Sequence, residues 1–196
     1  MKLKVGYIKE GVKTLGPGNR FVIWTQGCSR KCIGCASPEF QPLDGGYWVE
    51  TNDLASQICS CRLIDGITIS GGEPFLQAEA LCELLNKVNT IRPELTIIVF
   101  TGNKLESLTD MNSKAFLGFI DVLIDGEYLP QLNDGRGLRG SNNQRFIFLT
   151  ERLSNFRNEF ENCERKTEVY WADKKRQRMV TIGVPRPNRI RSSDLA

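Results

Sequence analysis

Three cysteines, Cys28, Cys32 and Cys35, lie within eight residues of a chain that contains no histidine. Thiolates at this C-x3-C-x2-C spacing are soft ligands that select zinc, Cu(I) or an iron–sulfur cluster. A structural zinc site takes four protein ligands, and Cys59 or Cys61 is the candidate for the fourth. Both fall on a predicted helix, where they point in different directions, so neither is an evident fourth ligand.

Three thiolates have a second use that needs no fourth cysteine. They can hold three irons of a [4Fe–4S] cluster and leave the fourth iron open, whereas a cluster that only transfers electrons normally takes four cysteines. An open metal position is typical of a catalytic site. At this point the motif leaves two alternatives, a completed zinc site and a catalytic cluster with an exchangeable position.

A second motif, Ser70-Gly71-Gly72-Glu73-Pro74, follows a short run of β-branched residues. Glycines at such a position let the backbone approach a ligand closely, because no Cβ stands in the way. On its own the motif is also an ordinary turn. Two further polar residues, Thr101 and Asp125, follow later predicted strands, and each is either a ligand contact or a strand-end cap.

The segments around these motifs alternate between strand and helix patterns. Strands are predicted at 20–25, 66–70, 95–100, 119–124 and 144–149, and helices from Thr51 or Asn52, at 76–91, at 104–118 and at 151–161. Such alternation predicts an α/β fold with a parallel sheet and helical crossovers. Ligands collect at the carboxyl ends of parallel strands, and each motif falls at such an end. About five units are too few for a closed eight-strand barrel, so an open or partial barrel is expected.

The 196 residues are expected to form one domain, with a core at 1–150 and a C-terminal helix, hairpin and basic tail at 151–196. No apolar run resembles a signal peptide or a membrane span, so we expect a cytoplasmic protein without a membrane partner. The net charge of +3 gives no reason to expect a nucleic-acid partner.

The C-terminal segment differs in composition from the rest of the chain. Residues 168–171 and 179–184 predict a terminal hairpin, and seven basic residues with no acidic one lie between Lys174 and Arg191. We interpret this stretch as a solvated tail. The alternative is a docking surface for an acidic partner.

The two motifs in this order resemble the radical S-adenosylmethionine (SAM) superfamily. The resemblance implies a partial (β/α)6 barrel in which three cysteines ligate a [4Fe–4S] cluster and SAM binds the fourth iron. It implies that Cys28, Cys32 and Cys35 are the metal ligands. It further implies cofactor contacts, with the SAM adenine, amino group, carboxylate or ribose, from Gly34, Ala36, Gly71, Gly72, Glu73, Thr101 and Asp125.

A narrower resemblance rests on Gly16-Pro17-Gly18-Asn19-Arg20, on Gln26-Gly27-Cys28 and on the segment Leu138–Gln144. These are similar to the glycyl-radical-enzyme activases, and Gly34 in place of an aromatic resembles the activating protein of anaerobic (class III) ribonucleotide reductase. Members use a reduced cluster to cleave SAM to methionine and a 5′-deoxyadenosyl radical, which abstracts hydrogen from a glycine Cα of the partner enzyme. The resemblance also implies a flavodoxin- or ferredoxin-type reductant.

Departures from the family pattern leave the partner open. Ala36 replaces an aromatic, Asn142 stands where a serine is expected, and the chain after 150 is longer than compact members need. The alternatives are a radical SAM enzyme for a nucleotide, a peptide, a tRNA-derived base or another glycyl radical enzyme, and a non-catalytic zinc or iron–sulfur protein. Arg20 and Arg139 are site, partner or surface salt-bridge candidates. The other four cysteines (Cys59, Cys61, Cys82 and Cys163) are interpreted as structural.

Overall fold

The computed structural model describes residues 1–171 and 179–187, and its centre is a seven-stranded sheet. The strand order is β3-β1-β2-β4-β5-β6-β7. Four adjacent strands are parallel, namely β2 (Arg20–Thr25), β4 (Gly66–Gly71), β5 (Thr96–Phe100) and β6 (Val122–Asp125). The predicted α/β class with a parallel core is therefore confirmed.

Antiparallel strands flank this core on both sides. β1 (Lys2–Val12) pairs with β2 and with β3 (Tyr47–Glu50), and β7 (Arg145–Phe148) pairs with β6. β1 and β3 were not predicted from the sequence, and the prediction that the strand at 144–149 belongs to the parallel sheet is wrong. β7 runs antiparallel because the chain between β6 and β7 forms a 3-10 turn at Pro130–Leu132 and not an α-helical crossover that would carry it back across the sheet. Within the described residues the sheet has four parallel strands, whereas the predicted partial (β/α)6 barrel would have six.

Three helices pack on one face of the sheet: α1 (Thr51–Ser60), α2 (Ala78–Ile91) and α3 (Met111–Leu117). α2 shows why, because Leu81, Leu84, Leu85 and Val88 recur at helical spacing and are all buried. It begins two residues later than predicted, after a 3-10 turn at Pro74–Gln77. The predicted helix at 104–118 is a 3-10 turn followed by α3, whose first turn is capped by the Asp110 side chain.

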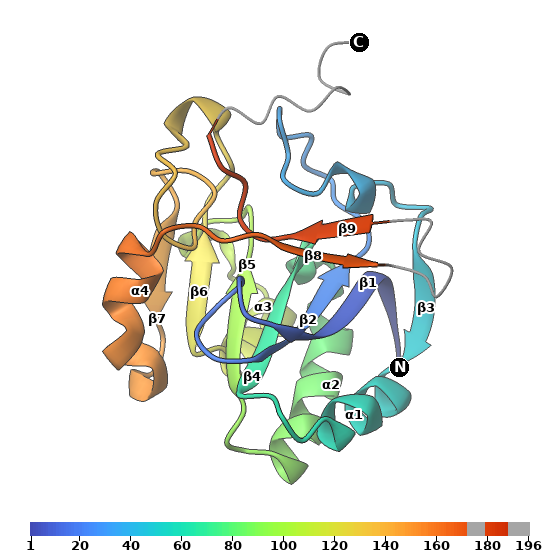
Figure 1. Ribbon diagram of the computed structural model, residues 1–196. Coiled ribbons are helices and arrows are strands. Elements are labelled where there is room, and N and C mark those ends of the chain that lie inside the picture. The colour runs from blue at the N-terminus through green and yellow to red at the C-terminus, as the bar shows by residue number, and fades with distance from the viewer. Residues whose placement is uncertain (172–178, 188–196) are drawn as a thin grey trace.

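The other face of the sheet carries the C-terminal part of the chain (Figure 1). The predicted hairpin is confirmed as β8 (Glu168–Trp171) paired with β9 (Met179–Ile182). Ile182 and the following Val184 pack with Val22 and Trp24 of β2 in a second apolar cluster. α4 (Arg157–Asn162) places Phe160 in a third cluster against β6.

Half of the basic stretch predicted as a tail, residues 174–178 and 188–191, lies outside the described residues, whereas 179–187 form β9 and the segment after it. Among the residues that the structure does describe, no helix combines the length and apolar character needed to cross a membrane.

Candidate functional site

A cavity of about 1310 Å³ lies at the carboxyl ends of the parallel strands. The loop after β2 supplies the three cysteines, and the residues after β4, β5 and β6 supply Gly72, Thr101–Gly102 and Gly126. The sequence prediction that these loops meet at one edge is therefore confirmed. Small-molecule sites usually occupy roughly 300–1,000 Å³, so this cavity has room for more than one small ligand.

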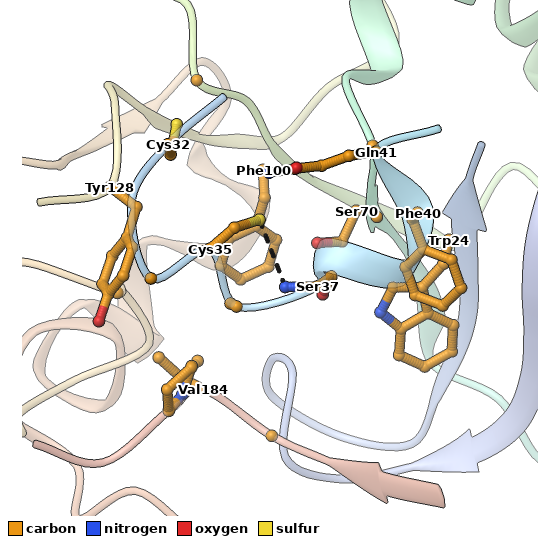
Figure 2. Close-up of a pocket in the computed structure, with 18 of the residues that line it drawn as sticks. Trp24, Cys32, Cys35, Ser37, Phe40, Gln41, Ser70, Phe100, Tyr128 and Val184 are labelled. Carbon is orange, nitrogen blue, oxygen red and sulfur yellow. Dashed lines mark hydrogen bonds between the residues drawn. The ribbon is translucent and has the colours of Figure 1, made fainter. Parts of the chain in front are cut away.

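The cysteine loop is fixed at its base by backbone hydrogen bonds. The Gly27 and Cys28 amides donate to the Phe40 and Gln41 carbonyls at 2.8 and 2.9 Å. Cys28, Cys32 and Cys35 are free, partly buried thiols that all line the cavity. The Ser37 amide donates to Cys35 Sγ at 3.4 Å (Figure 2). The loop thus presents three sulfurs to one space.

Two thiols of this loop, those of Cys28 and Cys32, have a pKa raised by their surroundings. Burial, followed by the nearby carboxylate of Glu127 and the other two thiols, raises the pKa of Cys32 to about 11. Burial also raises the pKa of Cys28, and a hydrogen bond from the Arg30 backbone and, to a smaller extent, the positive charge of the Arg30 side chain partly offset this rise. Iron and zinc bind thiolates and not thiols. Metal binding here must therefore displace the thiol protons, and the positive charge of the metal must offset the repulsion between the resulting thiolates.

The three sulfurs lie on one loop but do not converge on one point. Within the described ranges, 1–171 and 179–187, no group of three or more His, Cys, Asp or Glu side chains is gathered closely enough to hold a single metal ion. In a [4Fe–4S] cluster each thiolate binds a different iron, so its ligands need not share a point. The donor set and its shared cavity fit such a cluster with three cysteine ligands.

Cys59 and Cys61 lie away from this cavity. Both pack against the core under the helices on the opposite face of the sheet, and the Cys61 thiol donates to a Glu10 carboxylate oxygen at 2.8 Å. The fold therefore does not bring either of them to the cysteine loop as a fourth ligand.

Gly71 and Gly72 line the cavity, and the chain itself requires them to be glycine. Gly71 has a φ of +99°, and a Cβ on it would lie 2.6 Å from the Thr25 carbonyl oxygen. A Cβ on Gly72 would lie 2.3 Å from the Gly27 carbonyl oxygen. The sequence argument assigned the missing Cβ to ligand approach, whereas these contacts show that close packing against β2 and the cysteine loop already demands glycine.

Glu73 is a buried carboxylate that joins two strand ends. It accepts hydrogen bonds from the Thr101 hydroxyl at 2.7 Å, the Gly102 amide at 3.0 Å and the Phe75 amide at 3.1 Å. Burial raises its pKa, and these hydrogen bonds oppose the rise. Glu73 and Thr101 both line the cavity, but their polar atoms are occupied with each other. The arrangement holds the β4 and β5 loops in a fixed relation.

Asp125 is the one predicted contact residue that does not line the cavity. Its fully buried carboxylate accepts from the Leu105 amide at 2.8 Å and from Arg145 Nε at 2.9 Å. The neighbouring Gly126 lines the cavity in its place. These contacts are those of a strand-end cap with an ion pair.

Gly34 and Ala36, on either side of Cys35, both line the cavity. Gly34 has a φ of +66°, and a Cβ on it would lie 3.1 Å from Pro130. The cysteine loop therefore touches the β6–β7 loop (residues 126–144) at this glycine, which leaves little room for an aromatic side chain at position 34.

Sequence reasoning missed several residues of the site. Arg30 donates to Asn103 Oδ1 at 2.7 Å and packs against Gly102, so it ties the cysteine loop to the end of β5. Its position between two cysteines was the available signal. Tyr128 and Phe100 also border the cavity (Figure 2), and nothing in their local sequence indicates this.

The two arginines that the sequence offered as site or partner contacts make their contacts elsewhere in the fold. Arg20 is fully buried at the amino end of β2, opposite the cavity, where it donates to the Thr68 and Thr96 hydroxyls and to backbone carbonyls. Burial lowers its pKa to about 9. Arg139 pairs with Asp134 at 3.1 Å in the β6–β7 loop. The site role and the surface role expected for Arg20 are therefore both wrong.

Comparison with known proteins bears on this site. Residues 14–147 match the family described as 4Fe-4S single cluster domain. The chain is 36% identical over 135 residues to the anaerobic ribonucleoside-triphosphate reductase-activating protein of Enterobacteria phage T4, covering 66% of this chain and 84% of that protein. The protein of that name from Vibrio cholerae is 35% identical over 136 residues, covering 66% of this chain and 87% of its own length.

Two further matches are partial. The pyruvate formate-lyase 1-activating enzyme of Escherichia coli is 38% identical over 69 residues, covering 33% of this chain and 28% of that enzyme. The crystal structure of QueE from Escherichia coli aligns with a TM-score of 0.43 and 15% identity, over 53% of this chain and 54% of that chain. Neither match is extensive enough to place the site residues.

Proposed function

Because this chain belongs to the 4Fe-4S single cluster domain family of radical SAM enzymes, we propose that it generates the glycyl radical of an anaerobic ribonucleotide reductase. Its cofactors are a [4Fe–4S] cluster and SAM. The names of the relatives that the chain matches over more than four-fifths of their length suggest the partner. A flavodoxin- or ferredoxin-type protein is the proposed electron donor.

The observation that carries this proposal is the shared cavity at the strand ends. Cys28, Cys32 and Cys35 line it together with Gly71 and Gly72. We assign the three cysteines to the cluster and the two glycines, with Gly34 and Ala36, to backbone contact with SAM. The bound cofactors supply a 5′-deoxyadenosyl radical that abstracts hydrogen. The protein provides position and exclusion of water.

The residues around the ligands then have distinct roles. Glu73 and Thr101 hold the β4 and β5 loops together, and Asp125 fixes the loop after β5 through the Leu105 amide. Arg30 anchors the cysteine loop to Asn103 and places a positive charge near Cys28. A nearby cation favours the more negative, reduced state of a cluster, because net charge sets its reduction potential.

A second candidate partner is another glycyl radical enzyme. The matched segment of the pyruvate formate-lyase 1-activating enzyme favours it, although that segment is only 28% of the enzyme. The large cavity suits either partner, since both would have to present a polypeptide segment to the cofactor.

The test is electron paramagnetic resonance of the mixed proteins. Anaerobically reconstituted protein, SAM and a low-potential reductant are incubated with an anaerobic ribonucleotide reductase or with pyruvate formate-lyase. We expect a glycyl-radical doublet on the reductase. A doublet on pyruvate formate-lyase alone would assign the second candidate, and SAM cleavage with no doublet on either would overturn both.

A matched pair of variants controls this experiment. Cys32→Ala should abolish both SAM cleavage and the doublet, since it removes a proposed cluster ligand. Cys82→Ala, on α2 and away from the cavity, should leave both unchanged. A doublet that survives in Cys32→Ala would contradict the assignment of the cluster to this loop.

A further inference from the structure

The cavity has a wall that comes from outside the region shared with the family. The family match ends at residue 147, yet residues 180–187, which we call the C-terminal strap, line the cavity throughout. Figure 2 shows Val184 of the strap and Cys35 of the cysteine loop bordering the same space. The strap begins within β9 and continues beyond it next to the β6–β7 loop, which contributes Gly126, Tyr128, Pro130 and Asn133 to the same wall.

One buried side chain, Arg165, joins these two segments. Its Nη1 donates to the Pro185 carbonyl of the strap at 2.5 Å and to Asn133 Oδ1 of the β6–β7 loop at 2.6 Å. Its other nitrogens donate to three more carbonyls of that loop, those of Arg136 at 2.9 Å, Gly137 at 3.1 Å and Arg139 at 2.5 Å.

The guanidinium is suited to this task by its number of donors. It has five N–H groups in a rigid fork, and four carbonyls and one amide oxygen accept from them at 2.5 to 3.1 Å, with the Asp134 carboxylate as a longer sixth contact at 3.5 Å. Arg165 is only 2% exposed, so these acceptors would lose their partners in a dry environment if it were removed. Its own carbonyl accepts from Arg186 of the strap at 2.8 Å, which adds a second tie.

Arg165 does not itself line the cavity, although both segments that it joins do. The strap has further anchors, since Ile182 and Val184 pack on β2 and Pro187 lies 3.0 Å from the Cβ position of Gly135. Those contacts place the strap on the sheet. Asn133 Nδ2 of the β6–β7 loop also donates directly to the Pro185 carbonyl at 3.3 Å, and the hydrogen bonds of Arg165 reinforce this register from the buried side.

We propose that Arg165 is a positioning residue that locks the C-terminal strap to the β6–β7 loop and thereby shapes the cofactor cavity. The extension beyond residue 147 is then part of the site rather than an appendage. This inference rests on the SAM cofactor and does not depend on which protein is the partner. The proposal concerns the binding of ligands with an adenosyl group to the part of the cavity next to this wall.

The first measurement is the affinity of the reconstituted protein for S-adenosylhomocysteine, determined by calorimetry. Arg165→Ala and Arg165→Lys should each weaken binding by about tenfold or more, which corresponds to about 1.4 kcal/mol, with iron content unchanged. Lysine keeps the charge but has three donors on a point charge, so it cannot replace the fork. The matched control is Arg157→Ala, an exposed arginine of the same extension whose partner is Glu161.

The second measurement needs no cofactor. In the apoprotein, a bulky polyethylene-glycol maleimide should label Cys28, Cys32 and Cys35 faster in the Arg165 variants than in the parent protein. Cys59 and Cys82, on α1 and α2, serve as internal references whose labelling should not change.

The outcomes separate positioning from a merely structural role. Loss of affinity with selective labelling of the three loop cysteines supports the proposal. Unchanged affinity in folded Arg165→Lys overturns it. Equal acceleration at all cysteines in both variants also overturns it, because it reports general unfolding rather than a displaced wall.

Discussion

The Thr101 hydroxyl and the Glu73 carboxylate are joined by a hydrogen bond of 2.7 Å that links the ends of β5 and β4 at the cavity. Both side chains are almost fully buried. The carboxylate also accepts hydrogen bonds from the Gly102 and Phe75 amides. A residue expected to contact the cofactor is therefore also a structural link between two strand ends.

This link predicts a pH dependence of stability. Burial raises the pKa of Glu73 above its value of about 4.3 in an unfolded chain, so the folded protein binds a proton more tightly. The stability contributed by the protonated form is present below the unfolded pKa and is lost as the pH rises through the folded pKa. Glu73→Gln cannot titrate. The unfolding free energy of the parent minus that of the variant should therefore fall as the pH rises from about 4.3, the unfolded pKa, to the raised folded pKa.

Urea denaturation at several pH values measures this difference. The comparison cancels the titration of all other groups that the substitution leaves alone. A difference that stays constant or grows with pH would show that Glu73 is ionised in the folded protein throughout this range.

Gly72→Ala should destabilise the protein through a steric clash alone. The added Cβ would lie 2.3 Å from the Gly27 carbonyl oxygen and 2.9 Å from that of Phe40, both backbone atoms that cannot rotate away. Overpacking of this kind costs about 1–3 kcal/mol. Thermal unfolding should show the loss, and iron content after reconstitution should fall because the clash displaces the base of the cysteine loop.

Gly118→Ala is the matched control. Its φ is −63° at the end of α3, and its added Cβ would approach only the Ala115 carbonyl, at 3.2 Å. It should unfold near the temperature of the parent. If the unfolding temperature fell equally in the two variants, the crowding at Gly72 would add no destabilisation of its own and the prediction would be wrong.

The parts of the fold that the sequence predicted are those with local signals. Helix α2 has an apolar stripe, β2 and β4 are compact apolar runs, and the cysteine spacing marks the loop after β2. β1 was missed although Leu3 and Val5 alternate with lysines, because its glycines and charges mask the pattern. The direction of β7 is a property of the chain reversal before it, which no local pattern records.

The site divides in the same way. The cysteines and glycines were visible as motifs, whereas the contacts of Arg30, Tyr128 and the strap depend on segments that meet only in the folded chain. Arg20 shows the converse. It lies within a recognisable motif, but its side chain supports the opposite end of the sheet.

Asp125→Asn should reduce stability more than it reduces cofactor affinity. The buried carboxylate is bonded to the Leu105 amide and to Arg145, and loss of a charge from such a group costs about 1–3 kcal/mol. Because Asp125 does not line the cavity, binding of S-adenosylhomocysteine by the folded variant should change by less than about twofold, under roughly 0.4 kcal/mol.

Glu106→Gln controls for the loss of charge at the same arginine. Glu106 is 66% exposed and bonds Arg145 from the solvent side, where a pair contributes at most about 1 kcal/mol. It should leave stability and affinity close to those of the parent. A large loss of affinity in Asp125→Asn would instead assign Asp125 to the ligand, as the family resemblance implied.

Replacement of single cysteines by serine should separate the two sets of thiols. Cys28→Ser, Cys32→Ser and Cys35→Ser should each lose the brown colour and most of the iron after anaerobic reconstitution, because each removes one of three cluster ligands. Cys59→Ser and Cys61→Ser should retain both, since these residues pack on the opposite face of the sheet. Iron analysis and visible absorption measure the result. If Cys59→Ser or Cys61→Ser lost metal as completely as the loop variants, the three-cysteine assignment would fail and a four-thiolate site would take its place.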